Sequence, residues 1–236
     1  MNKSLSIYIP FYRSGSYLKE AVESVQQQTN PHWTLNIMDD CGPEGETVCA
    51  WVEGLNDPRI CYSRHRENLG MVGNWNSCLN HAQQNGAQFI TLLHDDDRLL
   101  PNYVELMFAQ VKLAPEAALY FCDASIIDNF GQPVFSFPDA FKKIIAPRAS
   151  SYILQGEDAL ARLLKGCFII CPTVCYNLSV IGESRFAEGY KQVQDLEFYL
   201  RILFAGLSIS GATELAYEYR RHPGNATALQ TLNMLR

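Results

Sequence analysis

The 236-residue sequence contains no apolar run as long as the roughly 18 to 20 residues that a membrane-spanning helix requires. We also expect no secretory signal in its N-terminal stretch, because the apolar part of that stretch is interrupted by Ser6 and stopped by Pro10. No basic run extends beyond Lys142 and Lys143, and the formal net charge is −6. These absences predict a cytoplasmic protein and argue against nucleic acid as a partner, whereas a bound cation suits the acidic balance.

The eight cysteines contain no CxxC pair. Cys167, Cys171 and Cys175 recur every four residues, as on one face of a helix, but Pro172 interrupts that helix and no histidine pair lies nearby. We therefore expect buried, reduced thiols and not a zinc or iron–sulfur site. A hydrophobic fraction of 47% and a charged fraction of 19% describe a globular protein with a substantial core.

Strand-like and helix-like patterns alternate over about the first 115 residues, which is typical of a parallel sheet. Strands are expected at 5–9, 33–38, 59–63 and 89–93, and helices at 15–28, 50–55, 72–82 and after Pro101. The second half is less regular. Its expected elements are a strand at 117–123, a hairpin with its turn at 128–131, a long surface loop at 137–151, helices at 158–165 and 195–205, and a last strand at 214–220. No linker separates two units, so the sequence predicts a single α/β domain, residues 1–236, with a Rossmann-like, mostly parallel sheet between helices.

Three adjacent carboxylates follow the apolar strand at 89–93: Asp95, Asp96 and Asp97, preceded by His94. Neighbouring like charges repel unless a cation or water relieves them. Ligands of open α/β sheets also bind at strand ends. The stretch therefore suggests a metal–diphosphate site. The alternative is a solvated turn in which one aspartate caps the next helix, with Pro101 near its start.

A second carboxylate pair, Asp39 and Asp40, follows the strand at 33–38. The loop after Pro10 lies at the same edge of a parallel sheet, so three polar loops are expected to converge there. For Asp39, an Asx turn with Gly42 is an equally good interpretation of the residues alone.

Six segments, in order along the chain, resemble motifs of glycosyltransferase family 2. SIYIPFYRSGSYLKEAVESVQQQT resembles the family's strand–Pro–aromatic opening and first helix. NIMDDCGPEGE resembles its DDgStDg turn, with Glu44 where an aspartate is usual. The others are ENLGMVGNWN for N-x-G-x5-N, LHDDDRLLP for L-D-x-D-D-x3-P, VQDLEFYLRI for ED-x-D-L-W-L-R and YEYRRHPGNAT for Y-R-x-H. The resemblance implies an inverting enzyme of the A-type glycosyltransferase fold that uses nucleotide sugars.

The resemblance also implies a metal site. Anchored on Pro101, His94 occupies the first carboxylate position of the D-x-D motif and Asp96 the second. Asp96 is therefore the expected ligand of a Mn²⁺ or Mg²⁺ ion that holds the diphosphate, and His222 is expected to complete the metal shell. A divalent ion neutralises the charge that develops on a departing diphosphate.

The same resemblance implies nucleotide contacts. Asp39 is expected to read the edge of the base, commonly uracil, and Asp95 to contact the ribose. Asp97 is expected to support the metal ligands. Further contacts are expected at Pro10, Phe11, Tyr12, Asn68, Gly70 and Arg220, with Arg221 as the alternative to Arg220 near the diphosphate.

Asp195 is the expected catalytic base. It lies six residues before Arg201, in the position of the family's ED aspartate, and Gln194 replaces the glutamate of that motif. In an inverting transfer, a carboxylate takes the proton of the acceptor hydroxyl while its oxygen attacks C1 opposite the leaving diphosphate. A helix N-cap is the alternative role for Asp195, and the two roles are compatible.

The resulting prediction is a metal-dependent glycosyltransferase whose residues 1–123 bind the nucleotide, with UDP-sugars favoured, and whose residues 124–236 bind the acceptor. A glycan, as in bacterial polysaccharide biosynthesis, a lipid-linked glycan and a protein all stay open as acceptors, and so does peripheral contact with the inner face of a membrane. Two alternatives remain. His94 and Gln194 favour a catalytically silent nucleotide-sugar-binding scaffold. A sugar nucleotidyltransferase would want a Gly-rich basic loop after the first strand, where PFYRSGSYL has one Arg.

Overall fold

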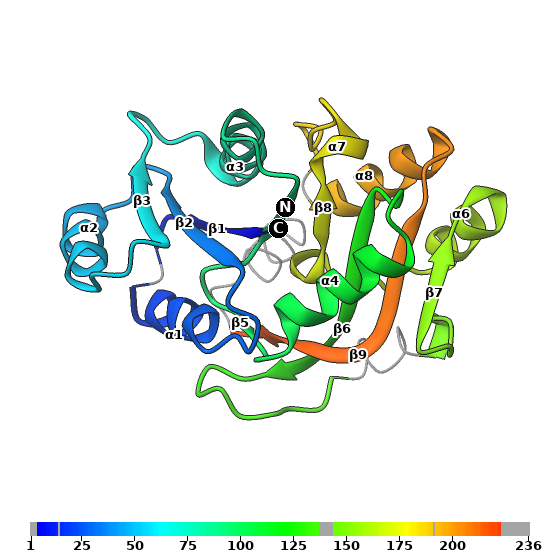
Figure 1. The fold of residues 1–236 in the computed structure, drawn as a ribbon, viewed down its shortest axis with the longest axis horizontal. Coiled ribbons are helices and arrows are strands. Elements are labelled where there is room, and N and C mark those ends of the chain that lie inside the picture. The colour runs from blue at the N-terminus through cyan, green and yellow to red at the C-terminus, as the bar shows by residue number, and fades with distance from the viewer. Residues whose placement is uncertain (1–3, 14, 137–143, 191, 223–236) are drawn as a thin grey trace, which may run out of the picture.

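The computed structural model describes residues 4–13, 15–136, 144–190 and 192–222. In its first half, four parallel strands lie in the order β3-β2-β1-β4 (Figure 1). They are β1 (Leu5–Phe11), β2 (Trp33–Asp39), β3 (Ile60–Arg64) and β4 (Phe89–Leu92). The helices between them are α1 (Gly15–Gln26), α2 (Gly45–Gly54) and α3 (Gly70–Gln84). The predicted alternation is therefore present, with α2 starting earlier than the expected residue 50.

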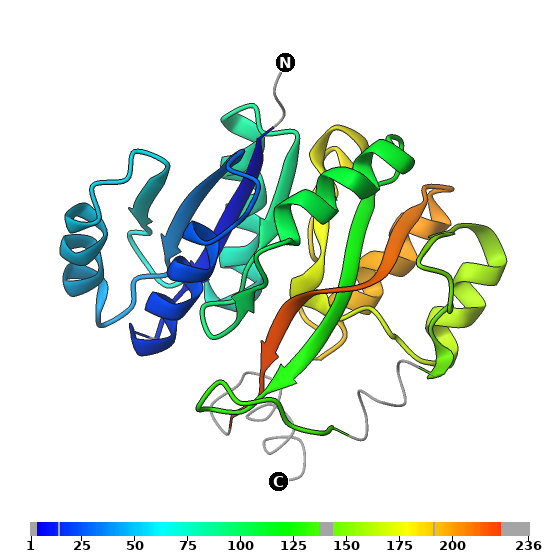
Figure 2. The same ribbon diagram turned by 60° about the horizontal axis from the view of Figure 1, so that its bottom comes forward.

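The second half extends the same sheet with mixed strand directions. Its long strands β6 (Leu119–Ile127) and β9 (Ile209–Arg220) pair in parallel, side by side in Figure 2. Three short strands run antiparallel to their neighbours: β8 (Cys175–Asn177) joins β4 to β6, and β5 (Arg98–Leu99) and β7 (Ser151–Leu154) pair with β9. The helical segments are α4 (Tyr103–Leu113), α6 (Gly156–Lys165), the 3₁₀ turn η1 (Cys171–Thr173), α7 (Leu178–Ile181) and α8 (Gln194–Phe204).

Two hydrophobic clusters cover opposite faces of the sheet. The first packs α1, α2 and α4 against residues such as Ile7, Ile9 and Ile37. The second packs α3, α6 and α8 against the other face, where Tyr8 and Ile90 point. The opposite orientation of neighbours such as Ile7 and Tyr8 follows from the two-residue period of a strand. The predicted single α/β domain with helices on both faces is confirmed.

The sequence prediction stops the first strand at Pro10, but β1 continues to Phe11. Proline is tolerated there because β4 pairs with β1 only as far as Leu92 opposite Tyr8, so no ladder partner faces Pro10 from that side.

The predicted hairpin turn is present after β6. Asp128 accepts hydrogen bonds from the backbone N–H groups of Phe130 and Gln132, at 2.8 and 2.9 Å, and Gly131 has φ +76°. The loop expected at 137–151 lies partly outside the described residues, and its last residue begins β7.

Candidate active site

The loops that follow β1, β2 and β4 meet at one edge of the sheet. Phe11 pairs with Asp39 in the register of β1 and β2, and the N–H of Asp40 donates to the carbonyl of Phe11 at 2.8 Å. On the other side of β1, the N–H of Leu93 donates to the carbonyl of Tyr8 at 2.9 Å. The convergence of three loops expected from the sequence is therefore seen in the structure.

Asp39 is buried within the loop that it begins. Its Oδ1 accepts the N–H of Gly42 at 2.7 Å, which is the Asx turn considered from the sequence, and its Oδ2 accepts the hydroxyl of Tyr62. Arg64 Nε lies 3.6 Å from the same Oδ2. Burial and the neighbouring carboxylate raise the pKa of Tyr62, so this phenol stays a donor. Tyr62 and Arg64 were missed because their only signal is their position near the end of β3.

The loop after β1 presents one aromatic ring to solvent. Phe11 is buried in the first core cluster, so its ring has no free face for a nucleotide base. Tyr12 is 38% exposed, and Pro10 is partly buried. The exposed Tyr12 ring could therefore stack on a base, whereas the buried Phe11 could offer only its backbone; contact of either residue with a nucleotide stays a prediction.

Asn68 and Gly70 hold the loop before α3 against the end of β2. Asn68 Nδ2 donates to the carbonyl of Asp40 at 2.9 Å, and Asn68 Oδ1 accepts the N–H of Gly70 at 3.1 Å. Gly70 has φ +73°, a conformation that glycine adopts without steric cost. The Asp40 carboxylate accepts the N–H of Leu69 at 2.7 Å. These contacts give both residues a role in shaping the loop, while their contact with a nucleotide stays a prediction.

The three aspartates after β4 have different surroundings. Asp95 and Asp96 are partly exposed, whereas Asp97 is fully buried and accepts the Tyr217 hydroxyl at 2.9 Å and the Arg220 N–H at 2.7 Å. Burial and the nearby Asp96 charge raise the pKa of Asp97 well above its usual range, although both donors oppose this. None of the three caps α4, whose N-cap is Asn102. The capping role in that alternative is therefore wrong, although Asp95 and Asp96 do lie in a partly exposed turn.

His94 lies between the indole of Trp75 and the buried carboxylate. Its ring stacks on Trp75 with centroids 5.5 Å apart, and its Nδ1 lies 3.8 Å from Asp97 Oδ2. Burial lowers the pKa of His94 and favours the neutral imidazole, which is the form that binds metals. Ligand atoms of His94, Asp96 and Asp97 all lie within 4.8 Å of one another, so this cluster has donors for a metal ion.

The two predicted metal ligands, Asp96 and His222, are brought together by β9. His222 Nε2 lies 3.0 Å from Asp96 Oδ2, although 126 positions separate the residues. The His222 ring also contacts Tyr17, with a centroid distance of 5.2 Å. Carboxylate oxygen and imidazole nitrogen are both donors that Mn²⁺ accepts, so the pair fits the expected ion.

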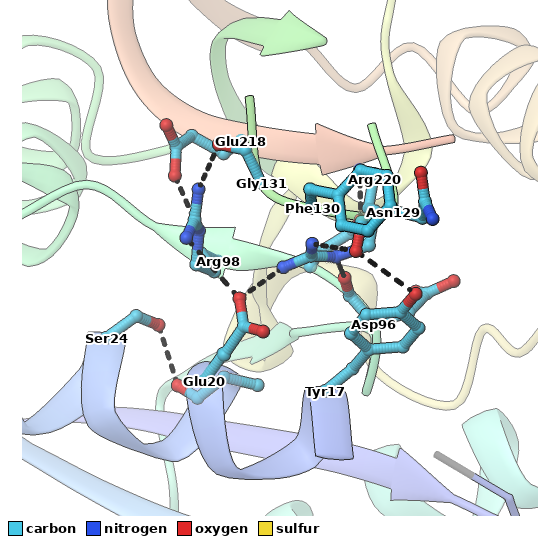
Figure 3. A network of polar contacts seen from close by, with 12 residues as sticks. Tyr17, Glu20, Ser24, Asp96, Arg98, Asn129, Phe130, Gly131, Glu218 and Arg220 are labelled. Atoms are coloured by element: carbon cyan, nitrogen blue, oxygen red, sulfur yellow. Dashed lines mark hydrogen bonds and ion pairs between the residues drawn. The ribbon is translucent and has the colours of Figure 1, made fainter. Parts of the chain in front are cut away.

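The family resemblance implied that Arg220 contacts the diphosphate, but in the structure its side chain binds other parts of the protein. Its side chain is fully buried and its Nε donates to the carbonyl of Asp96 at 2.7 Å. Figure 3 shows it facing Glu20 of α1, to which its Nη2 is bonded. Arg221 is exposed, and its N–H donates to the carbonyl of Ile127.

Asp195 is the second residue of α8, which has Val193 at its N-cap, so the alternative role of N-cap is not the one it has. Its carboxylate is partly exposed. After burial, which has the largest effect, the charge of Asp195 raises the pKa of Cys171, and the charge of Asp97 does the same. Cys171 therefore lies within electrostatic range of both carboxylates. Gln194 is buried and donates to the carbonyl of Tyr190.

The eight cysteines are free thiols, and three of them are fully buried. Among the helices that the structure describes, none combines the length and the apolar character needed to cross a membrane.

The family model described as glycosyl transferase family 2 matches residues 6–167, which is most of the chain and includes the loops after β1, β2 and β4, whereas Asp195 and His222 lie outside the match. The chain belongs to glycosyl transferase family 2. This confirms the family and the glycosyltransferase class of enzyme that the six motifs predicted.

Named relatives of this family 2 chain include bacterial proteins of polysaccharide biosynthesis. TuaG of Bacillus subtilis, named for teichuronic acid biosynthesis, is 27% identical over 216 residues, which are 92% of this chain and 78% of TuaG. WcaA of Escherichia coli, named for colanic acid biosynthesis, is 33% identical over 120 residues, which are 50% of this chain and 42% of WcaA.

Solved structures agree on the fold. TarS of S. aureus in complex with UDP-GlcNAc superposes with a TM-score of 0.72 at 17% identity, over 95% of this chain and 60% of that one. The mannosyltransferase PcManGT of Pyrobaculum calidifontis, in complex with GDP-Man and Mn²⁺, has a TM-score of 0.66 at 14% identity, over 100% of this chain and 62% of that one. The family 2 chain thus has the A-type glycosyltransferase fold and spans about 60% of these two structures.

Proposed function

We propose that this chain is a metal-dependent, inverting glycosyltransferase that moves a sugar from a nucleoside diphosphate to an acceptor hydroxyl. The observation that carries the proposal is the pairing of Asp96 and His222, at 3.0 Å, beside the end of β4. Two residues so far apart in sequence meet at the sheet edge where nucleotides bind in open α/β folds. A purely structural pair would not require both to be partly exposed, as they are.

Asp96 and His222 would hold the divalent ion, Mn²⁺ or Mg²⁺, with His94 beside them. When bound, the ion neutralises negative charge on the leaving diphosphate. Asp97 supports this arrangement from the protein interior, since its buried carboxylate binds Tyr217 and Arg220. A Mn²⁺ ion in PcManGT supports the choice of a divalent cation.

The nucleotide would lie over the loops after β1 and β2. Tyr12 offers an exposed ring on which a base can stack, and the partly exposed Asp95 would contact the ribose. Asp39 would read the base edge. Because its carboxylate is buried among Gly42, Tyr62 and Arg64, a base would bind Asp39 only after some of these groups move. UDP is the favoured nucleotide, supported by the UDP-GlcNAc complex of TarS.

Asp195 would act as the general base. Its partly exposed carboxylate at the start of α8 takes the proton of the acceptor hydroxyl while the oxygen attacks C1 of the donor sugar from the face opposite the diphosphate. The bond to the diphosphate oxygen breaks in the same step, which inverts the configuration at C1. Gln194 beside it carries no charge, so the base has no acidic neighbour at that position.

Residues 1–123 would bind the donor and residues 124–236 the acceptor. The names of TuaG and WcaA favour a glycan acceptor of polysaccharide biosynthesis. Action in the cytoplasm, at the inner face of a membrane that carries the acceptor, completes the proposal.

The test is release of nucleoside diphosphate from UDP-, GDP- and dTDP-sugars with Mn²⁺ and a broad acceptor mixture. The wild type is expected to prefer a UDP-sugar, and Asp195→Asn is expected to lose about 100- to 10,000-fold in rate. Gln194→Ala, which changes the neighbouring residue without removing the base, is the matched variant. If neither wild type nor Asp195→Asn releases nucleoside diphosphate from any donor, the chain is instead a silent nucleotide-sugar-binding protein. Equal, measurable rates in the two proteins would remove Asp195 as the base.

A further inference from the structure

Arg220 binds both the main chain and a side chain of the acidic loop, residues 95–97, that follows β4. Its Nε donates to the carbonyl of Asp96 at 2.7 Å, and its backbone N–H donates to Asp97 Oδ1 at 2.7 Å. Both contacts are at the end of β9. Since His222 follows two residues later, the same anchor fixes the position of the two proposed metal ligands relative to each other.

The other nitrogens of Arg220 bind two further segments. Its Nη2 pairs with Glu20 Oε2 of α1, and its Nη1 donates to the carbonyl of Asp128 in the turn after β6 at 3.2 Å. The guanidinium carbon lies 4.4 Å from the centre of the Tyr17 ring. Figure 3 shows Arg220 at the centre of this network, between α1 and the 128–131 turn. One side chain therefore connects four segments that are far apart in sequence.

A second arginine repeats part of this arrangement without reaching Asp96. Arg98 Nε pairs with Glu218 at 2.7 Å, its Nη1 lies 3.4 Å from Glu20, and its Nη2 donates to the carbonyl of Gly131. Glu20 is thus shared by Arg98 and Arg220. Glu218 belongs to the same network through Arg98, so its substitution serves as a control for a general change in the network.

The burial of Arg220 determines which role it can have. A guanidinium that is 0% exposed must be paired, because a buried charge without a partner is strongly destabilising. Glu20, which is partly exposed, supplies that charge. The planar fork of arginine donates in several directions at once, which the point charge of lysine cannot do. These contacts hold the loop from inside the protein, and the buried guanidinium offers no exposed surface to a diphosphate.

We propose that Arg220 is a positioning residue for the metal site, with Glu20 as its counter-ion, and not a ligand of the diphosphate. It holds the main chain of Asp96 so that the Asp96 carboxylate meets His222. The inference rests on the proposed metal-dependent function, because it assigns the support of that same site.

The experiment measures Mn²⁺ binding to the whole chain, by the loss of the free-ion signal in electron paramagnetic resonance. UDP binding is measured separately by calorimetry in EDTA. Arg220→Lys is expected to bind Mn²⁺ about 10- to 100-fold more weakly than wild type, the usual effect of removing a group that orients a metal ligand. Glu20→Gln is expected to weaken Mn²⁺ binding by about tenfold. Glu218→Gln is expected to match wild type. Metal-free UDP binding is expected to be the same in all four proteins.

Three results would overturn the inference. Unchanged Mn²⁺ affinity in both Arg220→Lys and Glu20→Gln would remove the positioning role. Weaker UDP binding of Arg220→Lys in EDTA would make Arg220 a phosphate contact. An equal loss of Mn²⁺ affinity in Glu218→Gln would show that any disturbance of the network weakens metal binding, with no specific role for Arg220. If Arg220→Lys does not fold, as thermal unfolding would reveal, Glu20→Gln decides alone. Absence of Mn²⁺ binding in the wild type would instead remove the proposed metal site and this inference with it.

Discussion

Adjacent residues at the carboxyl edge of the sheet have opposite surroundings. Asp96 and His222 keep 14% and 17% of their side chains exposed, while Asp97 and Arg220 keep none. The exposed pair can exchange its mutual contact for a ligand. The buried pair holds the loop through hydrogen bonds that would be costly to break, since each would leave a buried polar group unpaired. The residues proposed to bind the ion are therefore different from the buried residues that hold them in place.

The aromatic contact to the base can be tested at Tyr12. Replacing it with alanine is expected to weaken UDP binding by about 1–3 kcal/mol, the usual value of one stacked base, because the exposed ring is lost. Thermal stability should stay within about 0.5 kcal/mol of wild type, as for most surface substitutions. Calorimetric titration with UDP measures the first effect. Phe135→Ala, at a ring that is 83% exposed, is the matched control. Equal affinity of Tyr12→Ala and wild type would show that the base binds elsewhere.

At the level of single residues, the motifs predicted which side chains supply oxygen or nitrogen atoms to the site, but not which of them are buried. Asp39, Asp96 and His222 were named from motif position. The partners of Asp97 and Arg220 were not, because Tyr217 and Glu20 lie 120 and 200 positions away in sequence and no spacing rule connects them. The hydrogen bonds of a buried charge depend on the tertiary fold.

Between elements, the loops after β1 and β2 touch at Gly42. A Cβ atom on Gly42 would meet the carbonyl oxygen of Tyr12 and lie 3.1 Å from Asp39 Oδ1. The backbone oxygen cannot move without shifting the end of β1. The close approach of these loops therefore depends on the missing side chain at this position.

Gly42→Ala is accordingly expected to destabilise the protein by about 1–3 kcal/mol and to weaken UDP binding, because overpacking displaces the Tyr12 loop. Urea unfolding and UDP titration measure the two effects. Gly54→Ala is the control: no atom lies within 4 Å of the added Cβ, at the end of helix α2, so a gain of about 0.4–1 kcal/mol is expected. Similar destabilisation by both substitutions would contradict the proposed contact.

Elements with a clear period were predicted well, and short ones were not. The first-half strands and helices follow apolar repeats of two or of 3.6 residues. Strands β5, β7 and β8 have two, four and three residues, too few to show any period. They form because β9, β4 and β6 offer them edges to pair with, which is information about the whole fold.

Across the whole molecule, one sheet joins the two halves. β8 connects β4 to β6, and β9 runs from the second core cluster at Ile209 to Arg220, which binds the loop at 95–97 (Figure 2). Ligands that bind this edge contact both halves and should stabilise the fold as a unit.

Thermal unfolding with ligands tests this coupling. At one hundred times its dissociation constant, UDP with Mn²⁺ is expected to stabilise the wild type by about 2.7 kcal/mol. This corresponds to a rise in Tm of about 5–10 °C for a chain of this size. Adding EDTA to the same sample, or using Asp96→Asn, should remove the Mn²⁺-dependent part of that rise and leave the ligand-free Tm unchanged. An equal rise in Tm with and without Mn²⁺ would show that UDP binds independently of the metal ion.

The most direct measurement is a crystal structure of the chain with UDP and Mn²⁺, using anomalous scattering to locate the ion. We expect the ion in contact with Asp96 and His222, the uracil ring on Tyr12, and the Arg220 guanidinium still bonded to the Asp96 carbonyl and Glu20. An ion bound without Asp96, or a diphosphate bound directly to Arg220, would contradict it.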